Sequence, residues 1–189
     1  MTQNHKDLNL ENRPRDFPRP GSLFYTMMHN EKSKTRYIRL IKLVNKALIF
    51  LYKLRVLPLL GFGRRFLILT TKGRTSGKKR NNPLTYFRIN KTIHIFAGFG
   101  KKSDWFKNMI ANPDSVYVQV GFRKFHVNTV VLEGAELEEV LRWRAKKHSG
   151  FLKIGFGWNS KQDNPETADF SSLIELMKVI RLQKIQSVN

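Results

Sequence analysis

The sequence predicts an α+β protein built around a small, mostly antiparallel β-barrel with flanking helices. Two observations predict it: short β-prone segments separated by tight turns from residue 66 onward, and helical segments before, between and after them. A chain of 189 residues with 41% hydrophobic content can bury one such core. We therefore expect a flexible N-terminal arm over residues 1–33 and one barrel domain over residues 34–189.

The first 33 residues are polar and contain Pro14, Pro18 and Pro20, which is typical of a loosely docked arm. They show no secretory signal, and the chain has no cysteine. We therefore expect a cytoplasmic protein without disulfides or cysteine-bound zinc.

A basic amphipathic helix is expected over residues 35–57, followed by the helix-ending residues Pro58 and Gly61. Apolar residues recur on one face, at Tyr37, Ile41, Val44, Leu48 and Leu51. Cations occupy another face, at Arg39, Lys42, Lys46 and Lys53. The apolar run is too short to span a bilayer, which requires ~20 residues. Packing of this helix on the domain explains the pattern. Contact of the helix with the inner face of an anionic membrane also explains it.

Strands are expected at residues 66–71, 84–89, 92–97, 116–120 and 125–132, with a further candidate at 179–185. Helices are expected at 104–110, 135–147 and 170–177, and a Gly-rich aromatic loop at 155–158.

The formal net charge of +21 indicates an anionic partner. Nucleic acid, an anionic membrane and an anionic cofactor all satisfy this requirement. Lys and Arg are spread along the chain without a recognition-helix or RNP-like signature. A basic nucleic-acid-binding module is therefore retained as an alternative, while no specific nucleic acid is expected.

The segment from Thr70 to Pro83 has the sequence TTKGRTSGKKRNNP and lies between two β-prone runs. Its two glycines allow a sharp turn that brings backbone N–H groups close to a ligand. Arg74 and Arg80 can each donate paired hydrogen bonds to phosphate or carboxylate. The segment indicates a polyanion site, although an ordinary solvated basic turn explains the same residue types.

A second segment, from Ile95 to Pro113, ends a strand in small and aromatic residues and at once begins a helix. Small side chains there allow a flat ring to lie against the backbone, with Trp105 as one wall. N–H groups at the helix start can bind anionic edges of such a ring. A plain strand-to-helix turn with a core tryptophan is the alternative.

Catalytic and metal motifs are absent from the sequence. It has no triad, paired-carboxylate site, Rossmann loop or Walker loop, and its five histidines show no metal-ligand spacing. We therefore expect no metal site, and we expect a bound cofactor to supply any redox chemistry.

Together the two segments resemble the deazaflavin-dependent nitroreductase and quinone reductase family of split β-barrel oxidoreductases. The matching patterns are T-T-x-G-R-x-S-G-x-x-R-x-x-P-L at residues 70–84 and W-[YF]-x-N-x-x-A-N-P at residues 105–113. The resemblance covers residues 58–149. It implies coenzyme F420, a deazaflavin with a phosphate and an acidic tail, with FMN as the alternative cofactor. It also implies hydride transfer to a small quinone, nitro or enone acceptor, in a monomer or a homodimer.

The resemblance implies cofactor-binding roles by position. Phosphate and tail would be held by Gly73, Arg74, Thr75, Ser76, Gly77, Arg80 and Asn82, with Lys101 and Lys102 adding charge. The chromophore would be lined by Pro83, Thr85, Ala97, Gly98 and Trp105. The same barrel binding FMN, haem or a lipid without catalysis is the nearest alternative.

The sequence departs from the family around the acceptor. Phe99 stands where family members carry a lysine, and His148, Ser149, Gly150 and Phe151 stand where they carry tyrosines. A tyrosine proton donor therefore does not transfer to this chain. The catalytic residue is left unassigned, and His148 is kept as a candidate proton donor because histidine titrates near neutral pH.

Overall fold

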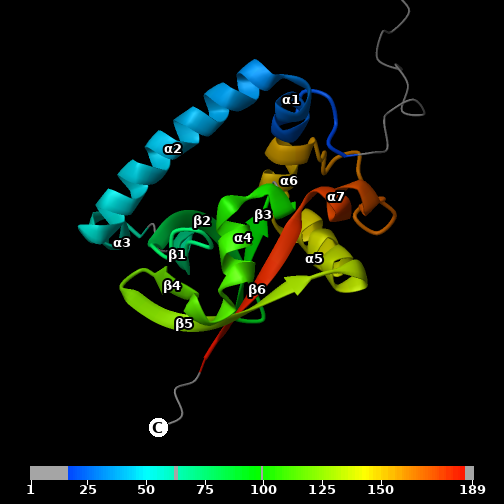
Figure 1. Cartoon of the computed structure of the whole chain (residues 1–189). Helices are drawn as coiled ribbons and strands as arrows, with labels where there is room; N and C mark the ends of the chain where they lie inside the picture. The colour runs from blue at the N-terminus through cyan, green and yellow to red at the C-terminus, as the bar shows by residue number, and fades with distance from the viewer. Residues whose placement is uncertain (1–16, 62–63, 99, 186–189) are drawn as a thin grey trace, which may run out of the picture.

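The computed structural model describes residues 17–61, 64–98 and 100–185, and it confirms the predicted α+β barrel (Figure 1). The described strands form a closed antiparallel barrel in the order β1-β2-β3-β6-β5-β4. They are β1 (Phe66–Lys72), β2 (Lys79–Ile89), β3 (Thr92–Ala97), β4 (Tyr117–Val120), β5 (Arg123–Leu132) and β6 (Lys178–Lys184). The α-helices are α1 (Leu23–His29), α2 (Glu31–Lys53), α3 (Val56–Leu59), α4 (Asp104–Ala111), α5 (Gly134–Lys147), α6 (Gly150–Phe156) and α7 (Ser171–Leu176).

The barrel interior is filled by alternate side chains of its strands, as a closed sheet requires. Leu67 and Leu69 of β1, Ile95 of β3 and Val118 of β4 are fully buried. The short helix α4 adds Met109 to the same cluster. The candidate strand near residues 179–185 is real, and β6 completes the barrel by pairing with β3 on one side and β5 on the other.

The first pair of strands is longer than the sequence predicted. β1 continues to Lys72 and β2 begins at Lys79, with Thr71 opposite Arg80. The basic loop therefore shrinks to residues 73–78, and Asn82 and Pro83 stand on a strand. Cross-strand pairing with β1 overrides the weak β-propensity of this polar stretch.

A second core lies between α5, α6 and α7, beside the barrel. Trp158, Phe170 and Leu141 are almost completely buried in it. The predicted Gly-rich loop at residues 155–158 is wrong at its first two residues, because α6 continues to Phe156. Gly157 ends the helix in the left-handed region, at φ 83°, which favours glycine.

The flexible arm predicted for residues 1–33 is wrong from Phe17 onward, while residues 1–16 lie outside the described residues. Phe17 is buried and stacks on Trp158, with ring centroids 5.9 Å apart. Arg19 forms a bidentate ion pair with Asp163 at 2.7 and 2.9 Å. Their partners lie more than 130 residues along the chain, so local composition could not indicate this packing.

Helix α2 begins and ends earlier than the predicted range of 35–57. Asn30 Oδ1 accepts a hydrogen bond from the Ser33 N–H at 2.9 Å and caps its start. Arg55, in the left-handed region at φ 63°, separates α2 from α3. In Figure 1 α2 runs along the outside of the molecule, from α1 at one end to α3 at the other. No helix in the described ranges is both long and apolar enough to cross a membrane.

The end of α2 is fixed to the barrel by Tyr52. Its side chain is buried against Leu57 and Ile68. Its hydroxyl oxygen accepts a hydrogen bond from the Gly121 N–H at 2.7 Å. Burial raises the pKa of Tyr52, so the hydroxyl stays neutral.

Candidate functional site

The loop between β1 and β2 is closed by its own backbone. The Gly73 N–H donates to Lys78 O at 2.9 Å, and the Gly77 N–H donates to Gly73 O at 2.8 Å. A Cβ at Gly73 would lie 2.7 Å from Ser76 Oγ and 3.3 Å from Lys78 O, so the turn leaves little room for a side chain there. These two amides are therefore not free for a ligand, contrary to the expectation from sequence.

Helix α4 holds this loop in place through Asn108. The Asn108 Oδ1 accepts hydrogen bonds from the Arg74 N–H at 3.1 Å and from Arg74 Nη1 at 3.0 Å. Asn112 Nδ2 donates to Lys72 O at 3.3 Å. The asparagines of the second sequence motif thus position the first motif, which gives a physical reason for the two motifs to occur together.

The two arginines of the loop differ in their surroundings. Arg74 Nη2 pairs with Asp104 Oδ1 at 3.0 Å, so both terminal nitrogens of Arg74 contact protein groups. Arg80 is exposed, and its Nη2 donates to the neutral Ser76 Oγ at 3.3 Å. Arg80 is therefore the better placed of the two to pair with an incoming anion.

A hollow of about 350 Å³ lies between this loop and α4. It is lined by Gly73, Arg74, Thr75, Ser76, Arg80, Asn82, Asp104, Trp105 and Asn108. Seven of these lining residues are candidates from the sequence, so strand and helix bring both motifs to one place. Asp104 is the only carboxylate among the lining residues, and its side chain is 83% exposed. The arrangement combines hydroxyl and guanidinium donors with an indole wall, which suits a phosphate or carboxylate attached to a flat ring.

Other predicted residues lie outside this hollow. Gly77 and the exposed Thr85 do not line it, and the buried Pro83 pairs with Ile68 behind it. Ala97 is buried in the barrel core. The side chain of Lys101 lies outside the described residues.

Gly98 and Lys102 line a separate cavity of about 620 Å³. Its other walls come from α1, the start of α2 and the junction of α7 and β6, through Phe24, Met27, Met28, Glu31, Lys34, Glu175, Leu176 and Lys178. A Cβ at Gly98 would lie 2.5 Å from the Phe24 ring, so α1 covers the backbone at which the sequence predicts a chromophore. This contact could not be foreseen because residues 17–33 were interpreted as an arm.

The structure does not bring His148 to either of these cavities. His148 is exposed at the end of α5, where its ring meets Trp143 edge-on at 5.9 Å between centroids. His94, in contrast, is buried, and desolvation lowers its pKa. Among the described residues, no three His, Asp or Glu side chains gather as metal ligands would.

The sequence reasoning missed Asp104 and Asn108 as residues that line the hollow and bond Arg74. Asn108 belongs to the motif that begins at Trp105, and Asp104 directly precedes that motif. The motif itself was therefore the available signal. Their roles depend on a contact between residue 74 and α4, which spacing along the chain does not show.

The geometry is that of a closed barrel with a hollow beside its first hairpin, lined by guanidinium, hydroxyl and indole groups. The model of the F420H(2)-dependent quinone reductase family matches residues 58–152. The chain therefore belongs to this family of F420-dependent oxidoreductases, and the resemblance, the enzyme class and the coenzyme predicted from sequence are confirmed.

Solved structures with similar folds include an F420-H2 dependent reductase, FDR-A, at 25% identity and a TM-score of 0.45, covering 64% of this chain and 95% of that one. A domain-swapped dimer matches at 26% identity and a TM-score of 0.44, covering 64% and 81%. General stress protein 26 from Bacillus anthracis matches at 13% identity and a TM-score of 0.40, covering 65% and 81%. A comparison with curated proteins gave no match.

Proposed function

We propose that this enzyme transfers a hydride from reduced F420 to a small electron-poor acceptor such as a quinone, a nitro compound or an enone. The observation that supports the proposal is the hollow in which Arg80, Ser76 and Trp105 lie together. Coenzyme F420 supplies the hydride when it is bound in its reduced form. The protein contributes orientation of the reacting groups.

The residues around the hollow fit the coenzyme's anionic portion. Arg80 would bind phosphate or tail carboxylate, with the Thr75 and Ser76 hydroxyls as further donors. Arg74 would set the shape of the loop through its bonds to Asn108 and Asp104. Trp105, half-buried at the start of α4, would face the flat ring. No proton donor is assigned, because His148 lies elsewhere.

A side-by-side titration with oxidised F420 and FMN tests this proposal. We expect F420 to bind the more tightly of the two, and its affinity to fall as salt is raised. Arg80→Gln is expected to weaken F420 binding about tenfold or more, because a charge-assisted hydrogen bond contributes about 1.5–3 kcal/mol. Lys78→Gln removes the same charge from a residue that does not line the hollow, and serves as the matched control.

Two results would contradict the proposal. Equal loss of affinity in the Arg80 and Lys78 variants would mean that only the overall positive field acts. Tighter binding of FMN, with no saturable binding of F420, would remove the coenzyme assignment of this hollow.

We also propose that α2 meets an anionic membrane on the cytoplasmic side, where a lipid-soluble acceptor would be available. The support is the basic character of the helix: Arg39, Lys42, Lys46 and Lys53 are all exposed.

A further inference from the structure

A second apolar stripe runs along the outer side of α2, and the sequence interpretation did not identify it. Its members are the exposed residues Leu40, Leu43, Ala47, Phe50 and Leu54. Their spacing alternates between three and four residues, which places them on one face of a helix. Leu43 is 67% exposed and Phe50 62%, so the barrel does not cover this face.

The stripe predicted from sequence lies on the neighbouring face of the helix, about 100° around its axis, and turns toward the barrel. Four of its five members are half-buried in the structure: Tyr37, Ile41, Leu48 and Leu51. The buried Tyr52 anchors the same side of the helix to the barrel. Helix α2 therefore has an inner apolar face that holds the fold together and an outer apolar face with no partner among the described residues.

Cations accompany the outer stripe along its length. Each stands one position before a member of the stripe, at Arg39, Lys42, Lys46 and Lys53. No acidic residue occurs in the sequence between Glu31 and Asp104. Glu31 itself is paired with Lys34 at 2.7 Å. The outer face of α2 is thus apolar in the middle and purely cationic at its edge.

This charge pattern decides which partner fits the stripe. Alternating three- and four-residue spacing is also found where two helices pair, so a second copy of the chain is a candidate. In a pair of helices, the residues that flank the contact line of one helix lie next to the flanking residues of the other. Stable pairs carry opposite charges at these positions. Two copies of α2 would set cations against cations in an antiparallel pair and against apolar side chains in a parallel pair, so opposite charges would meet in neither. Anionic lipid headgroups instead complement the cations while the acyl boundary receives the apolar side chains.

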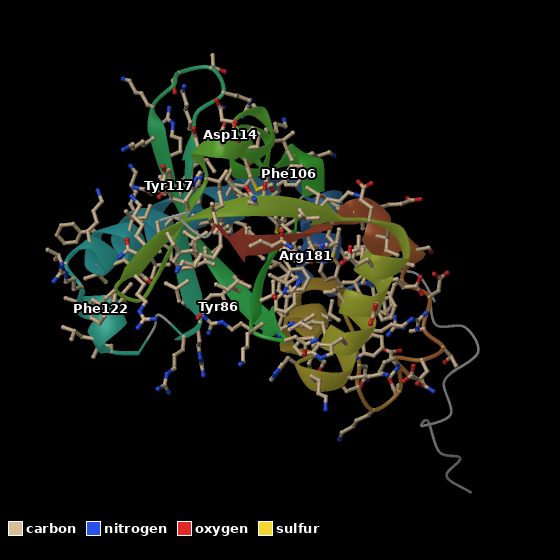
Figure 2. The ribbon with its side chains drawn as sticks, turned by 90° about the horizontal axis from the view of Figure 1, so that it is seen from below. Tyr86, Phe106, Asp114, Tyr117, Phe122 and Arg181 are labelled. Carbon is tan, nitrogen blue, oxygen red and sulfur yellow. The ribbon has the colours of Figure 1, made fainter. Side chains whose placement is uncertain are left out.

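The apolar surface continues beyond the end of α2. Leu59 and Leu60, at the end of α3, are 74% and 67% exposed, and Phe122 in the β4–β5 turn is 58% exposed. The β4–β5 turn lies beside α3 in Figure 1, and Figure 2 shows Phe122 on that side of the molecule. The hydrogen bond from Gly121 to Tyr52 fixes this turn against the helix.

We propose that the outer stripe of α2, extended by α3 and Phe122, lies in the interface of an anionic bilayer with the helix parallel to its plane. This deepens the proposed function, because it presents the barrel to acceptors dissolved in lipid. Binding to the membrane itself depends only on α2, α3 and the β4–β5 turn, not on the coenzyme.

Vesicle flotation of the full chain tests the proposal. We expect the wild type to float with vesicles of phosphatidylcholine and phosphatidylglycerol, and not with phosphatidylcholine alone. The double variant Leu43→Ser with Phe50→Ser is expected to lower the partition coefficient about tenfold or more, from the lost apolar burial. A variant with Glu at all four cationic positions of the stripe should not float.

The matched control is Ile110→Ser with Ile154→Ser, because these side chains are 52% and 70% exposed on other helices. It should float like the wild type. A wild type that stays in solution, or that floats equally with neutral vesicles, would overturn the proposal. So would a stripe variant that changes a dimer to a monomer in sedimentation and leaves flotation intact.

Titration of the same variants with F420 separates this proposal from the proposed function. Normal coenzyme affinity in a variant that fails to float is the expected result. Loss of coenzyme binding in the stripe variant would instead mean that the substitutions disturb the barrel. In that case the flotation of a second double variant, Leu59→Ser with Phe122→Ser, would test the proposal. Unchanged flotation of that second pair would overturn the proposal.

Discussion

Asp104→Asn should tighten coenzyme binding. Asp104 places a carboxylate at the edge of the hollow and holds one terminal nitrogen of Arg74 at 3.0 Å. Its charge repels any anion that enters, and its ion pair reduces the charge that Arg74 offers. The amide keeps the size of the side chain and removes both effects, while Asn108 continues to hold the other nitrogen of Arg74.

The magnitude follows from the position of the carboxylate. A unit charge about 5–8 Å from a bound anionic group contributes roughly 0.5–3 kcal/mol, depending on the effective dielectric constant. Because the Asp104 side chain is 83% exposed, the lower end applies, about 0.5–1 kcal/mol. That corresponds to affinity higher by about two- to fivefold. The loss of an exposed ion pair should lower the free energy of unfolding by less than about 1 kcal/mol.

Fluorescence or calorimetric titration with F420 at low and high salt measures this change. Asp114→Asn makes the same change in net charge at an exposed site that does not line the hollow, and Figure 2 shows Asp114. The gain should exceed that of the control and shrink as salt is added. Weaker binding than in the control would refute the reasoning, because Asp104 would then act chiefly by orienting Arg74.

Two further predictions concern stability. Tyr52→Phe removes the acceptor of the Gly121 N–H and should lower the free energy of unfolding by about 1–3 kcal/mol, measured by urea denaturation; an unchanged midpoint would contradict the anchoring role of Tyr52. His94 has a lowered pKa in the folded state because it is buried, so the unfolded chain binds its proton first as pH falls. Its contribution to stability is complete above the unfolded pKa of about 6.5 and is lost as pH falls below it. In the variant His94→Gln, the free energy of unfolding should depend less on pH between about 7 and 5. An unchanged dependence would mean that other groups cause it.

The barrel could be predicted because its strands carry their own signals. Residues 66–69 form an apolar, β-prone run, and turn residues separate most neighbouring strands. The start of β2 could not, because Lys79 and Arg80 have no local preference for a strand and are held in one by pairing with β1. Helix α1 and the packing of Phe17 escaped prediction for a similar reason, since their partners lie at the other end of the chain.

The sequence predicted which residues gather at the candidate site, but not what each of them does there. The motifs indicated that Arg74, Arg80 and Trp105 gather, and in the structure all three line one hollow. They could not show that Arg74 is bonded to Asp104 and Asn108 while Arg80 faces solvent. Such a division depends on a few ångströms of side-chain placement, which residue identity does not determine.

The packing of Phe17 and Arg19 has a practical consequence. Residues matched by the family model begin at position 58, yet the buried contacts of this domain reach back to Phe17. An expression fragment that begins at position 58 and keeps the rest of the chain would uncover the faces of Trp158 and Phe170 on which Phe17 stacks. It would also leave the carboxylate of Asp163, 10% exposed in the full chain, without its partner Arg19. Poor behaviour of such a fragment would reflect that exposed surface, and would say nothing about the barrel or its chemistry.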